Sequence, residues 1–193
     1  MKGFFFKLNF KYNLVSKNII LNEKDLEIIV NRLACQLIEN HHDFSNTILI
    51  GLQPRGKYLL ERLIHLLKNT YKMKVLNYGL LDITFYRDDF RRREKTLKAS
   101  STDNLNVEGK NIVLVDDVLF TGRSIRAALT AIETFGRPNQ IELMILIDRR
   151  YSRHLPIQPD YRGRQIDVYD NQKVIVNWKE KEENDSVYII DKK

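Results

Sequence analysis

The sequence predicts an α/β protein in which helices cover the faces of a mainly parallel, twisted sheet. Short apolar runs that resemble buried strands alternate along the chain with segments whose apolar residues recur at helical spacing. The runs at residues 112–115 and 141–147 are also apolar at almost every position, which is typical of strands buried on both faces.

Each element follows from a local signal in the chain. Asn22, followed by acids and then by apolar residues at helical spacing, predicts the start of a first helix. Gly136 and Pro138 predict the end of a later one. In chain order we then expect a strand at residues 46–51, a turn at 53–56, a helix at 57–69, an extended segment at 75–86, a strand at 112–115, a helix at about 124–135 and a strand at 141–147.

The remaining segments are less regular. Residues 87–110 are mainly polar and charged, so we expect a long loop, which in a compact domain is usually a lid or disordered. Residues 1–18 match neither a signal peptide nor a membrane span, and we expect an arm or an added strand. Residues 179–193 are expected to form a tail with a short strand at 187–190.

The composition limits the class of protein. The chain of 193 residues is long enough for one domain, and 43% hydrophobic with 30% charged residues indicates a globular protein. A formal net charge of +7 favours phosphate-rich partners. The single cysteine, Cys35, excludes an internal disulfide and favours the reducing cytoplasm. It lies beside the apolar stripe of the first helix, so we interpret it as a packing residue rather than a catalytic thiol.

The segment NIVLVDDVLFTGRS joins an apolar strand to two adjacent carboxylates and a Thr-Gly turn. In a parallel sheet, ligands bind beyond the carboxyl ends of the strands, where Asp116 and Asp117 are expected. The helix start that follows offers unpaired N–H groups, Gly122 permits close backbone approach, and Thr121 and Ser124 add hydroxyl groups. A ligand with sugar hydroxyls and a phosphate, such as ribose 5-phosphate, satisfies both parts. Asp117 could instead only cap the helix, which leaves the other acid without a role.

The same segment closely resembles the phosphoribosyl-pyrophosphate (PRPP) motif of type I phosphoribosyltransferases. The resemblance implies that Asp116 and Asp117 hold the ribose hydroxyls and assist catalysis, while the turn holds the 5-phosphate. The PRPP-binding residues that it implies in the turn are Val118, Leu119, Phe120, Thr121, Gly122, Arg123 and Ser124.

The turn Gln53-Pro54-Arg55-Gly56 resembles the pyrophosphate-binding loop of that family, so Pro54, Arg55 and Gly56 are expected to bind PRPP. Pro54 stands where the family often has Thr, which removes a hydroxyl donor. The Pro54–Arg55 bond is where the unusual backbone geometry of that loop is expected. Read without the resemblance, Arg55 is a surface charge on a turn.

Phe120 bears on the choice of base. In 6-oxopurine transferases the matching position resembles an aspartate that acts as general base, and Phe120 cannot move a proton. Adenine transferases tolerate an apolar residue there, so a purine enzyme stays as an alternative.

Three blocks, at residues 51–56, 81–90 and 146–163, closely resemble the PyrR family of bifunctional pyrimidine-operon regulators and uracil phosphoribosyltransferases. The resemblance runs from about residue 19 to 176. It implies a phosphoribosyltransferase domain at 19–178 with a flexible loop at 87–110 and a small hood at 148–173.

The PyrR resemblance also implies particular residues and partners. Arg87 would reach over the site from the loop, Arg149 would contact nucleotide phosphates or the base edge, and Val174 would line the base pocket. Mg²⁺ would be held mainly by PRPP and water, without direct protein ligands. The implied partners are uracil, PRPP, the nucleotides UMP and UTP, and a second copy of the chain in a homodimer or larger assembly.

RNA binding to a pyrimidine-operon leader transcript is the regulatory activity that the resemblance implies. The basic candidates for it are Arg32, Arg149, Arg150, Arg153, His154, Arg162 and Arg164. A solvated basic face that serves anionic nucleotides explains the same residues, and a UMP sensor with little turnover is a further alternative. One extra residue and Arg150 alter the family's Asp-Arg-Gly-His-Arg run. We interpret the pair His41-His42 as loop polarity rather than a metal site.

Overall fold

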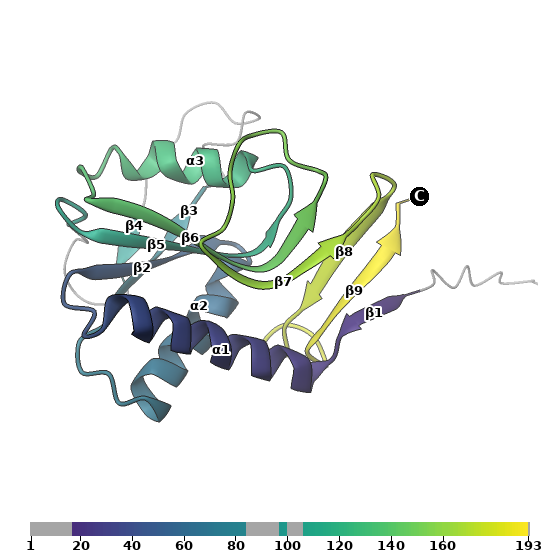
Figure 1. The fold of residues 1–193 in the computed structure, drawn as a ribbon, viewed down its shortest axis with the longest axis horizontal. Coiled ribbons are helices and arrows are strands. Elements are labelled where there is room, and N and C mark those ends of the chain that lie inside the picture. Colours follow the sequence, from purple (N-terminus) through teal and green to yellow (C-terminus); the bar gives the residue numbers. More distant parts are fainter. Residues whose placement is uncertain (1–16, 84–96, 100–105, 193) are drawn as a thin grey trace, which may run out of the picture.

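The computed structural model describes residues 17–83, 97–99 and 106–192, and shows a six-stranded sheet with a smaller three-stranded sheet beside it (Figure 1). The elements in chain order are β1 (Asn18–Leu21), α1 (Glu23–His41), β2 (Thr47–Gln53), α2 (Gly56–His65), the π-helical turn η1 (Leu66–Thr70), β3 (Asn77–Asp82), β4 (Leu97–Ala99), β5 (Asn111–Leu119), α3 (Arg123–Ile132), β6 (Gln140–Arg150), β7 (Tyr161–Asp167), β8 (Gln172–Asn177) and β9 (Ser186–Asp191).

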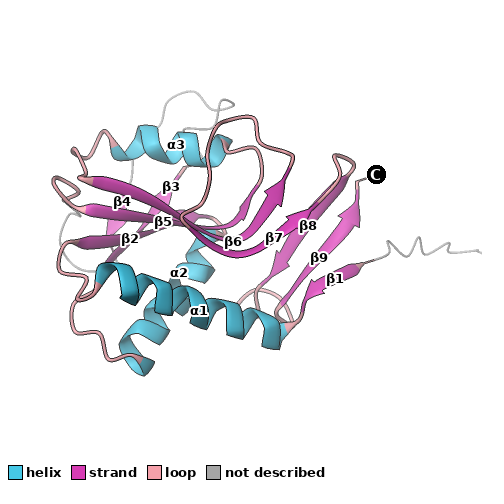
Figure 2. Cartoon of the chain, in the orientation of Figure 1, coloured by secondary structure: helices cyan, strands magenta, loops and turns pink. Residues whose placement is uncertain are grey.

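The main sheet has the order β4-β3-β2-β5-β6-β7. Its neighbouring strands pair in parallel, except β3 and β4, which pair antiparallel. Helices α1 and α2 lie on one face and α3 on the other (Figure 2). The predicted α/β architecture is therefore confirmed.

Alternation along β5 divides the core into two parts, one on each face of the sheet. Val113 and Val115 belong to the cluster beneath α1 and α2, whereas Ile112 and Leu114 belong to the cluster beneath α3. All four residues are fully buried, as expected for a central strand covered on both sides.

The small sheet has the order β1-β9-β8 and is antiparallel. Its composition differs from the predicted hood at 148–173. In that range, residues 161–167 form β7, which pairs with β6 and extends the main sheet. The strand predicted at 187–190 is the central strand of the small sheet, so the tail packs against the domain through buried Val187.

One predicted boundary is confirmed and two others differ from the sequence expectations. Asn22 caps α1 as predicted, in a capping box with Asp25. The strand predicted at 112–115 instead extends to Leu119, because β6 pairs with it along that length. The expected loop at 87–110 contributes β4, which pairs with β3.

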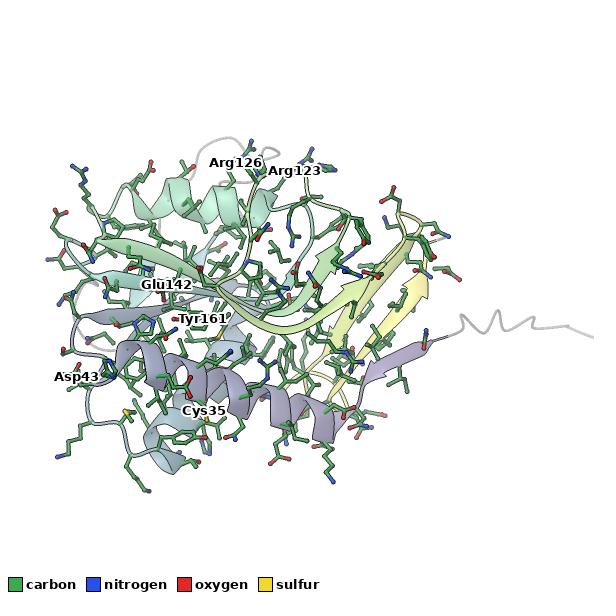
Figure 3. The ribbon with its side chains drawn as sticks, viewed as in Figure 1. Cys35, Asp43, Arg123, Arg126, Glu142 and Tyr161 are labelled. Carbon is green, nitrogen blue, oxygen red and sulfur yellow. The ribbon has the colours of Figure 1, made fainter. Side chains whose placement is uncertain are left out.

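Cys35 is partly buried on α1, where its Sγ lies 3.0 Å from the Tyr71 hydroxyl. Figure 3 shows it on the opposite side of the main sheet from Arg123. Within the described part of the chain, no helix is both long and apolar enough to cross a membrane.

Candidate functional site

The two adjacent acids lie within β5 rather than after it, and their side chains have different neighbours. Asp116 borders the turn that follows β5, and its Oδ1 would lie 3.2 Å from a Cβ added to Gly56 at the start of α2. Asp117 is paired with Arg55, the residue before α2. The two like charges that are neighbours in sequence therefore have different partners.

On the α3 side, Asp116 borders a hollow of about 260 Å³, which we call the cradle. The cradle is lined by Asp116, Val118, Leu119, Phe120, Thr121, Gly122, Arg123, Ser124 and Ile125. The structure therefore brings together the residues of the predicted phosphate turn and one of the two acids.

The backbone of the turn suits an anionic group. Gly122 has a φ of 88°, in the left-handed region that favours glycine, and it precedes the first turn of α3. The N-cap residue Gly122 has no side chain to cap the helix, and the Arg123 N–H makes only a long contact of 3.4 Å with Thr121 Oγ1. A helix start of this kind binds phosphate through its N–H groups and its positive dipole end.

The carboxylate of Asp117 is paired with Arg55. Arg55 Nε lies 3.0 Å from Asp117 Oδ2, and the guanidinium also donates to the Val176 carbonyl of β8. Asp117 is only 6% exposed, and this burial raises its pKa, although the charge and hydrogen bond of Arg55 oppose the rise. Arg55 is thus ion-paired with one of the two acids and is not a free surface charge.

The turn that carries Arg55 packs tightly against β5. A Cβ added to Gly56 would lie 2.3 Å from the Val115 carbonyl oxygen, so only glycine fits at the start of α2. The cis peptide bond of this turn joins Gln53 and Pro54, one residue before the expected position.

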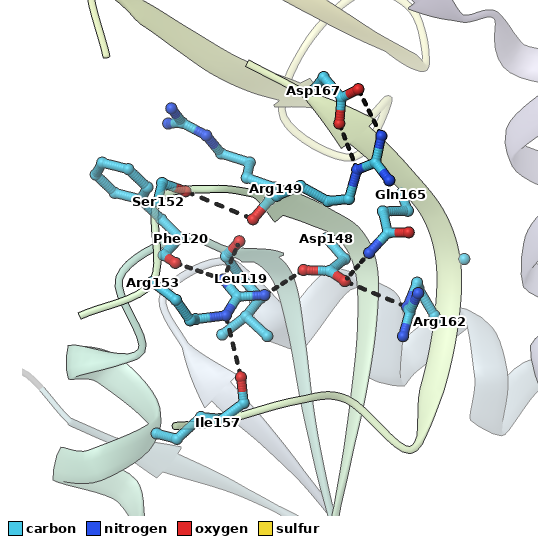
Figure 4. A network of polar contacts seen from close by, with 12 residues as sticks. Leu119, Phe120, Asp148, Arg149, Ser152, Arg153, Ile157, Arg162, Gln165 and Asp167 are labelled. Atoms are coloured by element: carbon cyan, nitrogen blue, oxygen red, sulfur yellow. Dashed lines mark hydrogen bonds and ion pairs between the residues drawn. The ribbon is translucent and has the colours of Figure 1, made fainter. Parts of the chain in front are cut away.

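Phe120 and Arg149 form a second contact at the edge of the cradle. The Arg149 Cζ lies 4.0 Å from the centre of the Phe120 ring (Figure 4). Arg149 is 3% exposed, and its Nε and Nη2 have no hydrogen-bond partner among the described residues. Burial lowers its pKa, which Asp170 partly offsets. A buried guanidinium with free donors favours a ligand that brings acceptors.

Most of the predicted RNA-binding arginines are engaged within the chain. Arg150 makes two contacts with Asp167, and Arg162 lies 3.2 Å from the Asp148 carboxylate. Arg32 donates to the carbonyls of Arg162 and Gly163 in β7. Arg153 is also turned inward, toward the cradle (Figure 4). The remaining candidates, His154 and Arg164, are exposed.

Two other residues that were expected to line the site, Val174 and Arg87, are not among the described residues that line the cradle. Val174 is buried in β8 within the core cluster of α1 and α2, and it does not line the cradle. Arg87 lies outside the described residues. The tail adds an unexpected residue, because Lys192 Nζ lies 5.7 Å from the centre of the Phe120 ring.

Asp148 is the acid that sequence reasoning missed. It is 3% exposed at the end of β6, opposite Leu119 in the register of β5 and β6. The signal was present, since Asp148 follows the apolar run at 141–147 just as Asp116 follows the run at 112–115.

His41 has structural partners at the far end of the sheet. Its ring contacts Thr47, Tyr161 and Glu142, the last at 2.9 Å. No group of three or more metal-ligating side chains occurs among the described residues.

Comparison with known proteins places this geometry in a family. Residues 16–183 match the family model described as a phosphoribosyl transferase domain. The bifunctional protein PyrR of Enterococcus faecalis is 37% identical over 173 residues, which cover 90% of this chain and 96% of the relative. The PyrR protein of Haemophilus ducreyi is 42% identical over 161 residues, or 83% of this chain and 89% of the relative.

Solved structures share the fold. A hypoxanthine phosphoribosyltransferase from Trypanosoma cruzi superposes with a TM-score of 0.68 at 15% identity, covering 92% of this chain and 98% of that one. One from Staphylococcus aureus gives 0.63 at 19% identity and covers 91% of each chain. At such low identity these structures support the architecture alone.

Proposed function

Because the chain belongs to the PyrR family of type I phosphoribosyltransferases, we propose that it transfers the ribose 5-phosphate of PRPP to uracil, with UMP and pyrophosphate as products. The single observation that carries this proposal is the continuity of the cradle. One hollow is bordered by Asp116 and by the uncapped start of α3, so a sugar hydroxyl and a phosphate of one ligand fit together.

The residues around the end of β5 would each hold a different part of the ligand. The turn at 120–124 holds the 5-phosphate through its N–H groups, and Asp116 accepts hydrogen bonds from the ribose. Arg55 and Gly56 lie where the pyrophosphate leaves, and Asp117 supplies negative charge beside them. As the anomeric bond stretches, the ribose becomes positive, and the two carboxylates stabilise that charge.

Mg²⁺ would be held largely by PRPP and water, since Asp117 is already paired with Arg55. Bound with PRPP, it would neutralise charge on the pyrophosphate leaving group. The protein orients the two substrates, and exclusion of water by Arg87 stays an expectation from the sequence, since Arg87 lies outside the described residues.

Uracil fits the edge formed by Phe120 and Arg149. The unpartnered Nε and Nη2 of Arg149 are suited to the carbonyl oxygens of the base, and such hydrogen bonds favour the uracil anion that attacks through N1. Phe120 offers a flat apolar wall and no proton acceptor, which disfavours a 6-oxopurine.

A direct test is pyrophosphate release from PRPP with uracil, adenine, hypoxanthine and orotate in parallel. We expect release with uracil, and a much weaker signal or none with the other three bases. Preference for hypoxanthine or adenine would replace the uracil assignment with the purine alternative. If PRPP binds but no base causes release, the protein would be assigned as a UMP sensor with little turnover.

RNA binding is the second function we propose. A cavity of about 570 Å³ beside the cradle is lined by Arg149, Arg150, Arg153 and Arg162, and Tyr151 is 84% exposed at its rim. Exposed aromatic rings and arginines are the groups that stack on unpaired RNA bases and contact phosphates. Since several of these arginines already pair with acids, Tyr151, His154 and Arg164 are the main candidates for direct contact.

Gel shifts with a pyrimidine-operon leader RNA at two salt concentrations, with and without UMP, test this function. We expect preference for the leader over scrambled RNA at both salt concentrations and tighter binding with UMP. Equal binding to both RNAs that disappears at high salt would indicate only general attraction of a basic face.

The proposal also includes a homodimer or larger assembly in the cytoplasm. Sedimentation of the purified protein measures the assembly directly, and a monomer at micromolar concentration would contradict it.

A further inference from the structure

Arg153 is the residue whose place in the structure differs most from its expected role on an RNA-binding face. Its three guanidinium nitrogens are all engaged within the chain (Figure 4). Nε donates to the Ile157 carbonyl at 3.0 Å, and Nη1 donates to the Leu119 carbonyl at 3.1 Å and to the Phe120 carbonyl. Nη2 contacts the carboxylate of Asp148. Arg153 thus joins the cradle to the end of β6.

Asp148 gives this arginine a fixed anchor. The carboxylate is buried and also accepts from Gln165 Nε2 at 3.1 Å, while Arg162 Nε lies 3.2 Å away. Gln165 and Arg162 both belong to β7, so the carboxylate is held from the neighbouring strand. A buried carboxylate with several charge-assisted contacts has little freedom to move, and it restricts Arg153 in turn.

The segment after Arg153 contacts the next part of the cradle. The His154 N–H donates to the Thr121 carbonyl at 3.0 Å. A Cβ added to Gly122 would lie 3.2 Å from Ile157 Cδ1, so this segment packs directly on the glycine of the turn. Contacts from residues 153–157 therefore reach four consecutive residues of the cradle, 119–122.

Because the peptide bond is planar, these contacts with backbone carbonyls also fix the direction of the N–H groups in the turn. In a planar trans peptide the carbonyl of one residue and the N–H of the next point in opposite directions. Arg153 holds the carbonyls of Leu119 and Phe120, so the N–H groups of residues 120 and 121 are directed away from it. The His154 amide holds the Thr121 carbonyl, so the N–H of residue 122 is directed away from His154. Such preorganised donors bind an anion more tightly than donors that must first be ordered.

We propose that Arg153 is a positioning residue of the cradle, which sets the affinity for the 5-phosphate without touching it. The inference rests on the proposed function, since it assumes that a sugar phosphate occupies the cradle. It assigns the inward-facing arginine to substrate binding rather than to contact with RNA.

The test compares Arg153→Ala and Arg153→Lys with the wild type. Calorimetry with ribose 5-phosphate measures binding without turnover, and steady-state assays give KM for PRPP, KM for uracil and kcat. We expect Arg153→Ala to weaken ribose 5-phosphate binding and raise KM for PRPP by about tenfold, the effect of losing one charge-assisted hydrogen bond. KM for uracil should stay within about twofold. The affinity of Arg153→Lys for ribose 5-phosphate and its KM for PRPP should lie between those of the wild type and Arg153→Ala, because one ammonium group cannot reach all of the acceptors.

Two further variants keep the result interpretable. Arg137→Ala removes an exposed arginine at the opposite end of the main sheet, and it should bind ribose 5-phosphate as the wild type does. Asp148→Asn should change KM for PRPP in the same direction as Arg153→Ala, and the double variant should be no worse than the poorer single one. If Arg153→Ala fails to fold, Arg153→Lys and Asp148→Asn provide the same comparison.

The outcomes separate the two proposals. Wild-type affinity for ribose 5-phosphate in a folded Arg153→Ala variant would overturn the positioning role, as would equal rises in KM for both substrates. Failure of the wild type to bind PRPP would refute the proposed function itself.

Discussion

The guanidinium of Arg55 and the carboxylate of Asp117 join the start of α2 to β5 through a contact of 3.0 Å. The side chain of Asp117 is 8% exposed and that of Arg55 is 43% exposed, so a half-open cation neutralises a buried acid. This pair explains how two adjacent aspartates coexist, since Asp116 turns to the cradle and Asp117 to Arg55.

Replacing Asp117 with asparagine tests the catalytic part of this arrangement. The amide keeps the shape of the side chain but removes the negative charge that stabilises the developing ribose cation. We expect kcat to fall by roughly tens- to thousands-fold in the pyrophosphate-release assay. Lys57→Ala, a change at a partly exposed residue of α2, serves as the matched control. A wild-type rate for Asp117→Asn would refute the assignment.

Arg55→Met should lower the stability of the folded protein, because it leaves the buried carboxylate of Asp117 without its cation. Burial already raises the pKa of Asp117 and Arg55 opposes the rise, so removing the cation raises it further. Allowing for the half-exposed arginine, we expect the free energy of unfolding at pH 7 to fall by about 1–2 kcal/mol.

This loss should depend on pH in a defined direction. A raised folded-state pKa means that the native state binds more protons than the unfolded state above the ordinary value of 3.8. The variant should therefore recover stability as the pH falls from 7 toward 4, when Asp117 becomes neutral. Urea denaturation across that range measures the change, and a constant loss would contradict the ion pair as its cause.

Gly56→Ala tests the close approach of α2 to β5. The new Cβ would lie 2.3 Å from a backbone oxygen that cannot rotate away, so the helix start must shift. We expect a loss of about 1–3 kcal/mol in the free energy of unfolding, measured by urea denaturation, together with weaker binding of pyrophosphate. Lys57→Ala changes the next residue without a steric conflict and should stay within about 0.5 kcal/mol of the wild type.

Asp185→Asn tests the contact between α2 and the residue that precedes β9. Burial acts to raise the pKa of Asp185, but hydrogen bonds from Arg62 and from the Lys179 amide outweigh it, and the pKa is lowered. At pH 7 the variant should lose on the order of 3 kcal/mol, because both contacts with Arg62 are 2.7 Å long and largely buried.

The sign of the pH effect is opposite to that for Asp117. A lowered folded-state pKa stabilises the protein above the ordinary value of 3.8, and the contribution disappears as the pH falls through the folded-state value. The difference between wild type and variant should therefore be full at pH 7 and shrink below about pH 4. Denaturation at several pH values measures it, and a difference that grows in acid would exclude this mechanism.

The sequence alone was sufficient for the α/β class and for the composition of the cradle. Both rest on local signals: apolar runs identify buried strands, Asn22 identifies a helix start, and the Thr-Gly turn after two acids predicts the residues that line the cradle. These signals involve residues within a few positions of one another, so no knowledge of distant contacts is needed.

The sequence was less informative where an element depends on its neighbours in space. Pairing with β6 carries β5 through Asp116 and Asp117, so the two acids belong to the strand and not to the turn after it. Pairing among β1, β8 and β9 decides which residues form the small sheet, and residues 161–167 join the main sheet instead.

Charge is the property that most depended on the tertiary structure. The sequence of a basic run does not show whether its arginines face solvent or pair with acids from other strands, because those acids are far away in the sequence. Only the fold brings Asp148 and the carbonyls of the turn to Arg153, and Val176 and Asp117 to Arg55. Local periodicity therefore determined the architecture, and the acids followed by a Thr-Gly turn led to the proposed ligand, whereas long-range packing decided which charged groups are already paired within the protein.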